Sequence, residues 1–174
     1  YRDQVVLAGA TPRVVSTSQE TGFVPDVEAI AAAITPATRA IVLNSPSNPT
    51  GAVYPADVLA TIVRLAEQHD LWIISDEIYD HLVYDGVPHA SVMAIPEARE
   101  RTIYVNGFSK TFAMTGWRIG YSVSPPHVAE QISNIQDQVT SNSTTFVQHG
   151  AIMALQLPAE VHIEMRNIFE ARRD

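Results

Sequence analysis

The sequence predicts an α/β domain with a mainly parallel sheet. Three short apolar runs, at Ala40–Leu43, Leu71–Ile74 and Ile103–Val105, are typical of parallel strands that are covered on both faces. Longer segments with helical periodicity lie between these runs. Strands that alternate with helices of this length predict a three-layer α/β/α fold.

Other elements of the first half follow from local signals. Arg13–Thr17 is a short β-rich run after an Ala-Gly-Ala turn, and we expect a strand there. Pro25–Ile34 is expected to be a helix, because Asp26 and Glu28 suit the positive end of its dipole. Pro55–His69 is predicted to be an amphipathic helix. Its apolar stripe consists of Val58, Ile62, Leu65 and Ala66.

The second half continues the alternation and then becomes helical. We expect a further strand at Ile119–Val123, parallel or antiparallel, followed by helices over Pro126–Thr140, Thr144–Leu155 and Pro158–Arg172. Trp72 and Trp117 are expected to belong to the core.

Composition excludes several classes of function. The net charge of −8, with only 11 basic residues, argues against binding to nucleic acid. The absence of cysteine excludes disulfides, thiolate metal sites and cysteine nucleophiles, and it is compatible with a cytoplasmic protein. The six histidines lack metal-ligand spacing, so no metal site is predicted. No apolar run approaches the roughly 20 residues of a membrane span.

The two ends of the chain indicate a piece of a longer protein. The sequence has no initiator Met, begins at Tyr1 in the middle of a pattern, and stops at Asp174 inside a predicted helix. We therefore expect further segments on both sides.

Polar, chemically capable residues follow three predicted strands. Asn48 lies beyond the first of these strands, Asp76 closes the second, and Lys110 follows the third. Ligands of parallel sheets collect at the carboxyl ends of the strands, so these residues are expected to share one binding edge.

Each motif also has a purely structural interpretation. The segment Asn44–Gly51, with two prolines, could be only a rigid surface turn. Asp76, after four apolar residues, is expected to be largely removed from water, but it could simply cap the following turn. Lys110 could lie on a solvated loop, or it could be a nucleophilic amine activated by burial or by Arg118.

Taken together, the motifs indicate one cofactor and one family. An Asp for a pyridine nitrogen, a Lys for an aldehyde and an Arg for a phosphate are the minimum set for pyridoxal 5′-phosphate. In order and spacing, the chain resembles the fold-type I aminotransferases of class I/II, which include aspartate and aromatic aminotransferases. The resemblance rests on Asn48–Gly51, Asp76–Tyr79 and Phe108–Tyr121.

The resemblance implies a role for each matched residue. Lys110 would form the Schiff base with the cofactor and then move a proton between the substrate α-carbon and the cofactor C4′. Asp76 would pair with the pyridinium nitrogen, and Arg118 would hold the phosphate. Asn48 and Tyr79 would hydrogen-bond the 3′-oxygen of the ring.

One position departs from the pattern of many relatives. They have a Ser three residues before the lysine that donates its hydroxyl to the phosphate, whereas this chain has Gly107. Ser109 is a candidate substitute as a cofactor-binding residue.

The family also implies the wider organisation and activity. The chain would be most of the cofactor-binding large domain, with residues 158–174 leading toward a C-terminal small domain and an N-terminal part also missing. The whole protein would be a cytoplasmic homodimer that transfers an amino group between an amino acid and a 2-oxo acid, and the fragment alone would be inactive. Two alternatives stay open: a pyridoxal-phosphate C–S lyase or related amino-acid enzyme, and the aminotransferase-like sensor domain of a transcription regulator.

Overall fold

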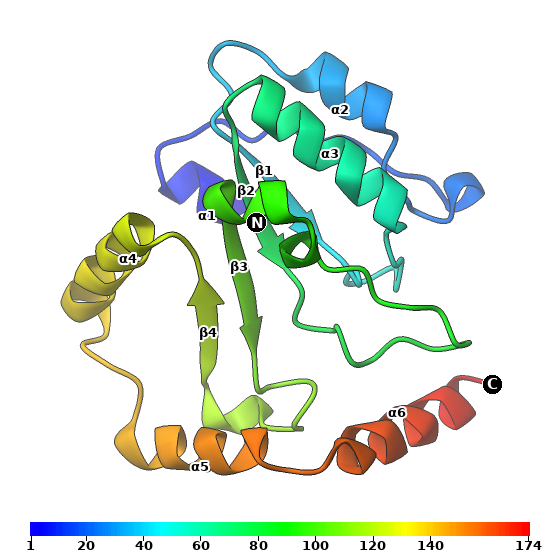
Figure 1. Cartoon of the computed structure of the whole chain (residues 1–174), viewed down its shortest axis with the longest axis vertical. Helices are drawn as coiled ribbons and strands as arrows, with labels where there is room; N and C mark the ends of the chain where they lie inside the picture. The colour runs from blue at the N-terminus through cyan, green and yellow to red at the C-terminus, as the bar shows by residue number, and fades with distance from the viewer.

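One four-stranded sheet organises the chain (Figure 1). The computed structural model describes residues 1–174, and the strands are β1 (Ala40–Asn44), β2 (Trp72–Asp76), β3 (Thr102–Gly107) and β4 (Gly120–Val123), in that order across the sheet. β1, β2 and β3 are parallel, and β4 is antiparallel to β3. The predicted α/β class with a mainly parallel sheet is confirmed.

Two helices contribute to the main core beside β1 and β2. Helix α2 (Val27–Ala33) packs against α3 (Ala56–Gln68), and the two lie side by side in Figure 1. Asp26 caps α2 by accepting a hydrogen bond from the amide of Glu28, as the sequence suggests for a helix start. The main core consists of Ile30, Leu43, Leu59, Ile62, Val63, Ala66, Leu71, Ile73, Val92 and Ala98.

Three further helices run in succession away from α2 and α3, as Figure 1 shows. Their bounds are α4 (Pro126–Val139), α5 (Thr145–Leu155) and α6 (Ala159–Arg173), within a residue of the predicted ones. α4 and α6 contain no buried residue, and all of β4 is exposed. None of the helices has both the length and the apolar character required to span a bilayer.

Several short elements complete the chain. They are α1 (Arg2–Leu7) and the 3₁₀ helices η1 (Gln19–Thr21), η2 (Val92–Ala94), η3 (Pro96–Arg101) and η4 (Thr115–Trp117).

Two expectations about local structure were wrong. Arg13–Thr17 forms no strand: Val15 packs on the main core, but Val14 is 73% exposed and the segment pairs with no neighbouring strand. A β-rich run needs a partner that accepts its backbone hydrogen bonds, and periodicity alone does not supply one. Trp117 is 45% exposed rather than in the core, because its ring lies over Gly150 at the surface of α5.

Candidate active site

The carboxyl ends of β1, β2 and β3 meet at one edge of the sheet, as predicted. Asn44 at the end of β1 is aligned with Asp76 at the end of β2, and Asp76 is aligned with Val105 of β3. The loops that leave this edge carry Asn48, Tyr79 and Lys110, so parallel pairing brings distant parts of the chain together.

The turn after β1 is held by the side chain of Asn44. Its Oδ1 accepts from the amide of Asn48 at 2.9 Å, and its Nδ2 donates to the backbone oxygen of Asp76 at 3.2 Å. Gly51 ends the turn with a φ of 74°, which favours glycine. Asn48 itself is exposed, and its Nδ2 lies 3.4 Å from the Tyr79 hydroxyl. The segment is therefore a rigid turn that also presents an amide donor.

The two carboxylate oxygens of Asp76 accept hydrogen bonds from different donors. Oδ1 accepts from the amide of Ile78 at 3.1 Å, which caps the turn after β2. Oδ2 accepts from the phenol of Tyr1. Asp76 is half-buried and so less removed from water than the preceding apolar run predicted, because the end of β2 emerges at the edge of the sheet.

The contact with Tyr1 tests whether a pyridine ring suits Asp76. Burial and the neighbouring Asp76 carboxylate raise the pKa of the Tyr1 phenol, so this group stays a neutral donor. A flat six-membered ring with one polar hydrogen thus already reaches Oδ2. A protonated pyridine nitrogen would offer the same chemistry, so the carboxylate fits pyridoxal phosphate.

Lys110 lies close to Tyr79. Its Nζ is 5.4 Å from the centre of the Tyr79 ring, over the face of the ring, and the side chain is half-buried. This is a cation–π distance. The structure therefore brings Asn48, Tyr79 and Lys110 into one cluster, with Asp76 at the end of the adjoining strand.

The loop after β3 is tightly wound. The amides of Phe112 and Met114 both donate to the backbone oxygen of Phe108, and Ala113 has a positive φ of 53°. Non-glycine residues seldom adopt this conformation, and such outliers gather at functional sites. Phe108 and Met114 are buried in a second, smaller core that also contains Ala151 and Ala154 of α5.

Arg118 is not joined to the cluster. It is exposed, has a φ of 52°, and its Nη1 donates to the backbone oxygen of Thr115 at 3.0 Å. The other N–H groups of the guanidinium are left for a ligand. Its role at a phosphate stays a prediction.

Packing leaves little room for a side chain at Gly107. A Cβ at Gly107 would lie 3.0 Å from Gly120 Cα and 3.1 Å from the backbone oxygen of Ile119. Both neighbours are backbone atoms, of β4 and of the residue before it, and they would have to shift by a few tenths of an ångström. Ser109 is half-buried immediately before Lys110, and its proposed contact with a phosphate stays a prediction.

Sequence reasoning missed a polar network beside the cluster. Asp80 accepts hydrogen bonds from Asn106 Nδ2 at 2.9 Å and from Thr111 Oγ1 at 3.2 Å. Both donors flank the predicted lysine loop. The only signal was a run of polar residues at the ends of two buried strands.

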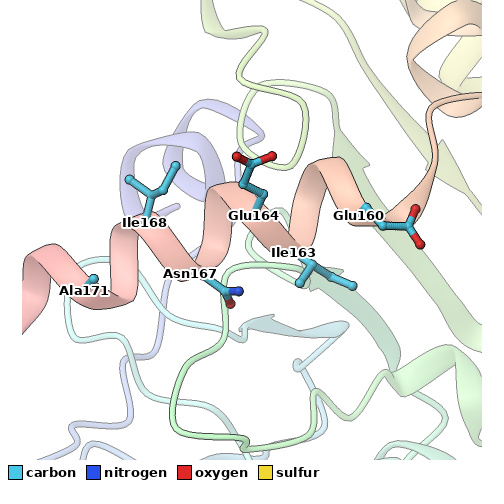
Figure 2. A pocket seen from close by; sticks show the side chains of 6 residues that line it. All are labelled: Glu160, Ile163, Glu164, Asn167, Ile168 and Ala171. Atoms are coloured by element: carbon cyan, nitrogen blue, oxygen red, sulfur yellow. The ribbon is translucent and has the colours of Figure 1, made fainter.

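A hollow in the surface lies elsewhere. It has a volume of about 450 Å³ and runs along α6, from which all of its lining side chains come (Figure 2). None of the predicted cofactor residues lines it. The hollow follows the unpacked surface of a helix and is not the active site.

The chain is similar to known proteins along its whole length. The chain matches the family Aminotransferase class I and II over residues 1–174. It is 45% identical to the aspartate/prephenate aminotransferase of Thermus thermophilus, with 100% of this chain and 45% of that protein covered. It is 43% identical to aromatic-amino-acid aminotransferase 2 of Thermococcus litoralis, with 100% and 45% covered.

A solved structure shows the same fold. The aromatic aminotransferase from Pyrococcus horikoshii matches with a TM-score of 0.96 and 41% identity, over 99% of this chain and 47% of that chain. The chain therefore spans somewhat less than half the length of the relatives that it matches. The predicted resemblance and fold class are confirmed, and the chain belongs to the class I and II aminotransferases.

Proposed function

We propose that the protein containing this chain transfers an amino group between an amino acid and a 2-oxo acid, with pyridoxal 5′-phosphate as cofactor. The observation that carries the proposal is the cluster at the sheet edge. There the amine of Lys110 lies over Tyr79, the Tyr79 hydroxyl lies 3.4 Å from the Asn48 amide, and Asp76 ends the adjoining strand.

The residues of the cluster suit the parts of this cofactor. Asp76 Oδ2 would accept from the ring nitrogen and keep it protonated, as it now accepts from Tyr1. Tyr79 and Asn48 would donate to the ring oxygen, and Arg118 would form charged hydrogen bonds with the phosphate. When bound, the cofactor supplies an aldehyde for covalent attachment and a ring that accepts electrons.

Lys110 would carry the covalent link and then move the proton. A lysine that acts as general base at the α-carbon of the substrate accepts the proton as a neutral amine. Lys110 is also the only lysine among the 174 residues, so no neighbouring lysine could replace it.

The direct test uses borohydride reduction of the full-length protein loaded with pyridoxal phosphate. The expected result is a fixed cofactor on the peptide that contains Lys110, detected by mass spectrometry. The Lys110→Ala protein should give no adduct on this peptide. An unaltered protein whose fixed cofactor lies on a peptide outside residues 1–174, with none on the Lys110 peptide, would contradict the assignment of the lysine.

A second measurement tests the reaction itself. Amino donors and 2-oxo acids are supplied in pairs, and formation of the new amino acid is followed. Transfer to the 2-oxo acid supports the proposal, while release of ammonia and pyruvate without transfer would contradict it.

We also infer the wider organisation that the family implies. Residues 1–174 would form most of the large cofactor-binding domain, with about residues 158–174 leading toward a small domain, inside a cytoplasmic homodimer. The coverage of the relatives supports the domain assignment. Sedimentation equilibrium of the full-length protein should give twice the mass of one chain, and a monomer would contradict the homodimer.

A further inference from the structure

A carboxylate that the proposed reaction does not use lies between the two loops that carry Tyr79 and Lys110. Asp80 directly follows Tyr79, and Thr111 directly follows Lys110. The Thr111 hydroxyl donates to Asp80 Oδ1 across 3.2 Å. The two loops are therefore joined one residue beyond the two side chains proposed to meet the cofactor.

The second oxygen of Asp80 is attached to β3. Asn106 Nδ2 donates to Asp80 Oδ2 across 2.9 Å, while Asn106 Oδ1 accepts from the Gly107 amide across 2.7 Å. Asn106 and Thr111 are only 5% and 3% exposed. Each carboxylate oxygen thus receives a buried donor. Turning the carboxylate away would leave the Thr111 hydroxyl without its acceptor and would leave Asn106 Nδ2 with the Tyr104 hydroxyl alone, at a cost in free energy.

The turn that carries Asp80 follows β2 directly and is held by its own backbone hydrogen bonds. The amide of Asp80 donates to the backbone oxygen of Glu77 across 3.0 Å, and the amide of Leu82 donates to that of Tyr79 across 2.8 Å. Asp80 therefore stands on a defined turn on one side and is bonded to two buried donors on the other.

We propose that Asp80 is a positioning residue, which sets the spacing between the Lys110 amine and the Tyr79 phenol through its hydrogen bonds to Thr111 and Asn106. The inference rests on the proposed function, because this spacing matters only if both side chains meet the same cofactor. Without the bridge, the lysine loop would be held mainly by its own turns and by the small core on α5.

The spacing has a spectroscopic consequence. A hydrogen bond from Tyr79 to the ring oxygen of the cofactor stabilises the anionic form of that oxygen, which favours loss of the proton from the linked lysine nitrogen. A looser spacing weakens this hydrogen bond. The pH at which the visible absorption band of the loaded protein changes should then rise.

The test compares threonine variants of the full-length protein loaded with pyridoxal phosphate. Thr111→Val keeps the shape of the side chain but removes the donor. The midpoint of the pH titration should rise by about half a unit, and the Kd of the apoprotein for pyridoxal phosphate should rise about fivefold, as expected for one lost hydrogen bond. Thr111→Ser keeps the hydroxyl and should restore both values.

Thr102 offers a matched control. It is a fully buried threonine at the start of β3, and its hydroxyl has no hydrogen-bond partner. Thr102→Val makes the same chemical change on β3, the strand that leads into the lysine loop, and outside the network. Its midpoint and Kd should equal those of the unaltered protein.

Asp80→Asn provides a second route to the same result. The amide has one acceptor oxygen where the carboxylate has two, so it cannot serve both Asn106 and Thr111. Its midpoint should also rise. If thermal melting shows that Thr111→Val does not fold, the Asp80→Asn protein carries the comparison.

Two results separate the possible failures. A folded Thr111→Val protein with an unchanged midpoint and Kd would overturn the positioning role, while a borohydride-fixed cofactor on Lys110 would leave the proposed function standing. An unaltered protein that neither binds pyridoxal phosphate nor shows a visible band would overturn the proposed function and this inference with it.

Discussion

Two regions of the molecule are built in opposite ways. Around α2 and α3, apolar side chains of helices and strands meet in a continuous core in which Ile62, Ile73 and Ala66 are completely buried. The edge strand β4 and the helices α4 and α6, by contrast, contain no buried residue. The first region is built on a buried core, whereas the second presents apolar surface.

The candidate active-site cluster draws on both regions. Asp76 and Tyr79 stand on β2 and the turn after it, next to the main core. Lys110 stands on a loop whose buried residues, Phe108 and Met114, pack on α5. The lysine therefore stands in the region with the smaller core. A hydrogen bond such as that between Thr111 and Asp80 contributes most to the position of a side chain in such a region.

The largest expected effect breaks the main core. Ile62→Ala should lower the free energy of unfolding by about 2–5 kcal/mol, because the residue is completely buried on α3 and its removal leaves a cavity. Ile135→Ala on α4, where the side chain is 65% exposed, should change it by less than about 0.5 kcal/mol. Urea denaturation of the 174-residue chain measures both.

A comparable loss for Ile135→Ala would show that α4 is covered in solution. The contrast between the core around α2 and α3 and the exposed helix α4 would then be wrong for this chain. Light scattering would show whether self-association covers α4.

The second prediction concerns the charged group buried beside the main core. Glu77 is 1% exposed and accepts hydrogen bonds from Ser75 Oγ at 3.0 Å and from the amide of Val92 at 3.1 Å, and its Oε2 lies 2.7 Å from His89 Nε2. Glu77→Ala should cost about 3 kcal/mol of unfolding free energy, because buried donors lose their acceptor.

An exposed glutamate from the same part of the chain is the control. Glu97→Ala on η3 should change the unfolding free energy by less than about 0.5 kcal/mol. Equal effects of the two variants in urea denaturation would mean that the Glu77 network adds nothing to stability.

The third prediction concerns the apolar surface of α4 and α5. Val139 at the end of α4 and Phe146 at the start of α5 are 72% and 71% exposed. Replacing both with Ser should leave the unfolding free energy within about 0.5 kcal/mol and reduce self-association of the chain, because exposed apolar patches promote association. Analytical ultracentrifugation measures the association.

Val14 is the matched control for this pair. It is 73% exposed, but it belongs to the segment that failed to form a strand and not to α4 or α5. Val14→Ser should leave self-association unchanged. A similar decrease for Val14→Ser would show that any exposed apolar residue has the effect and that the surface of α4 and α5 is not special.

The same contrast separates what the sequence could predict from what it could not. Elements next to the main core are dictated by apolar periodicity, so the strands of the parallel sheet and α3 were predicted to within two residues. Arg13–Thr17 has the same kind of composition without a partner strand, and partners are a property of the fold.

The site divides in a similar way. Asn48, Asp76, Tyr79 and Lys110 follow buried strands, and parallel pairing places them at one edge. The crowding at Gly107 and the hydrogen bonds of Asp80 depend on the distance between two loops or strands. Such distances are fixed by packing, which no local pattern encodes.

The smallest expected effect concerns the polar attachment of α6. With no buried residue, this helix is held at its end by Arg173, which donates to both carboxylate oxygens of Asp85 at 2.7 and 2.8 Å and lies over the ring of Tyr84. The hydrogen bond with Arg173 lowers the pKa of the Asp85 carboxyl below its ordinary value of 3.8. The ion pair therefore stabilises the docked helix above about pH 4 and is lost as the pH falls through the lowered pKa.

Hydrogen exchange of the α6 amides measures this attachment. Protection should decrease between pH 4 and pH 2 at low salt, and the decrease should be smaller in 1 M salt, which screens exposed charges. Asp85→Asn should weaken protection at neutral pH and remove the acid-dependent step, whereas Asp26→Asn, which caps α2, should leave the step in place. An unchanged step in Asp85→Asn would assign the acid sensitivity of α6 to another carboxylate, with Glu170, which accepts from the Asp85 amide, the next to replace.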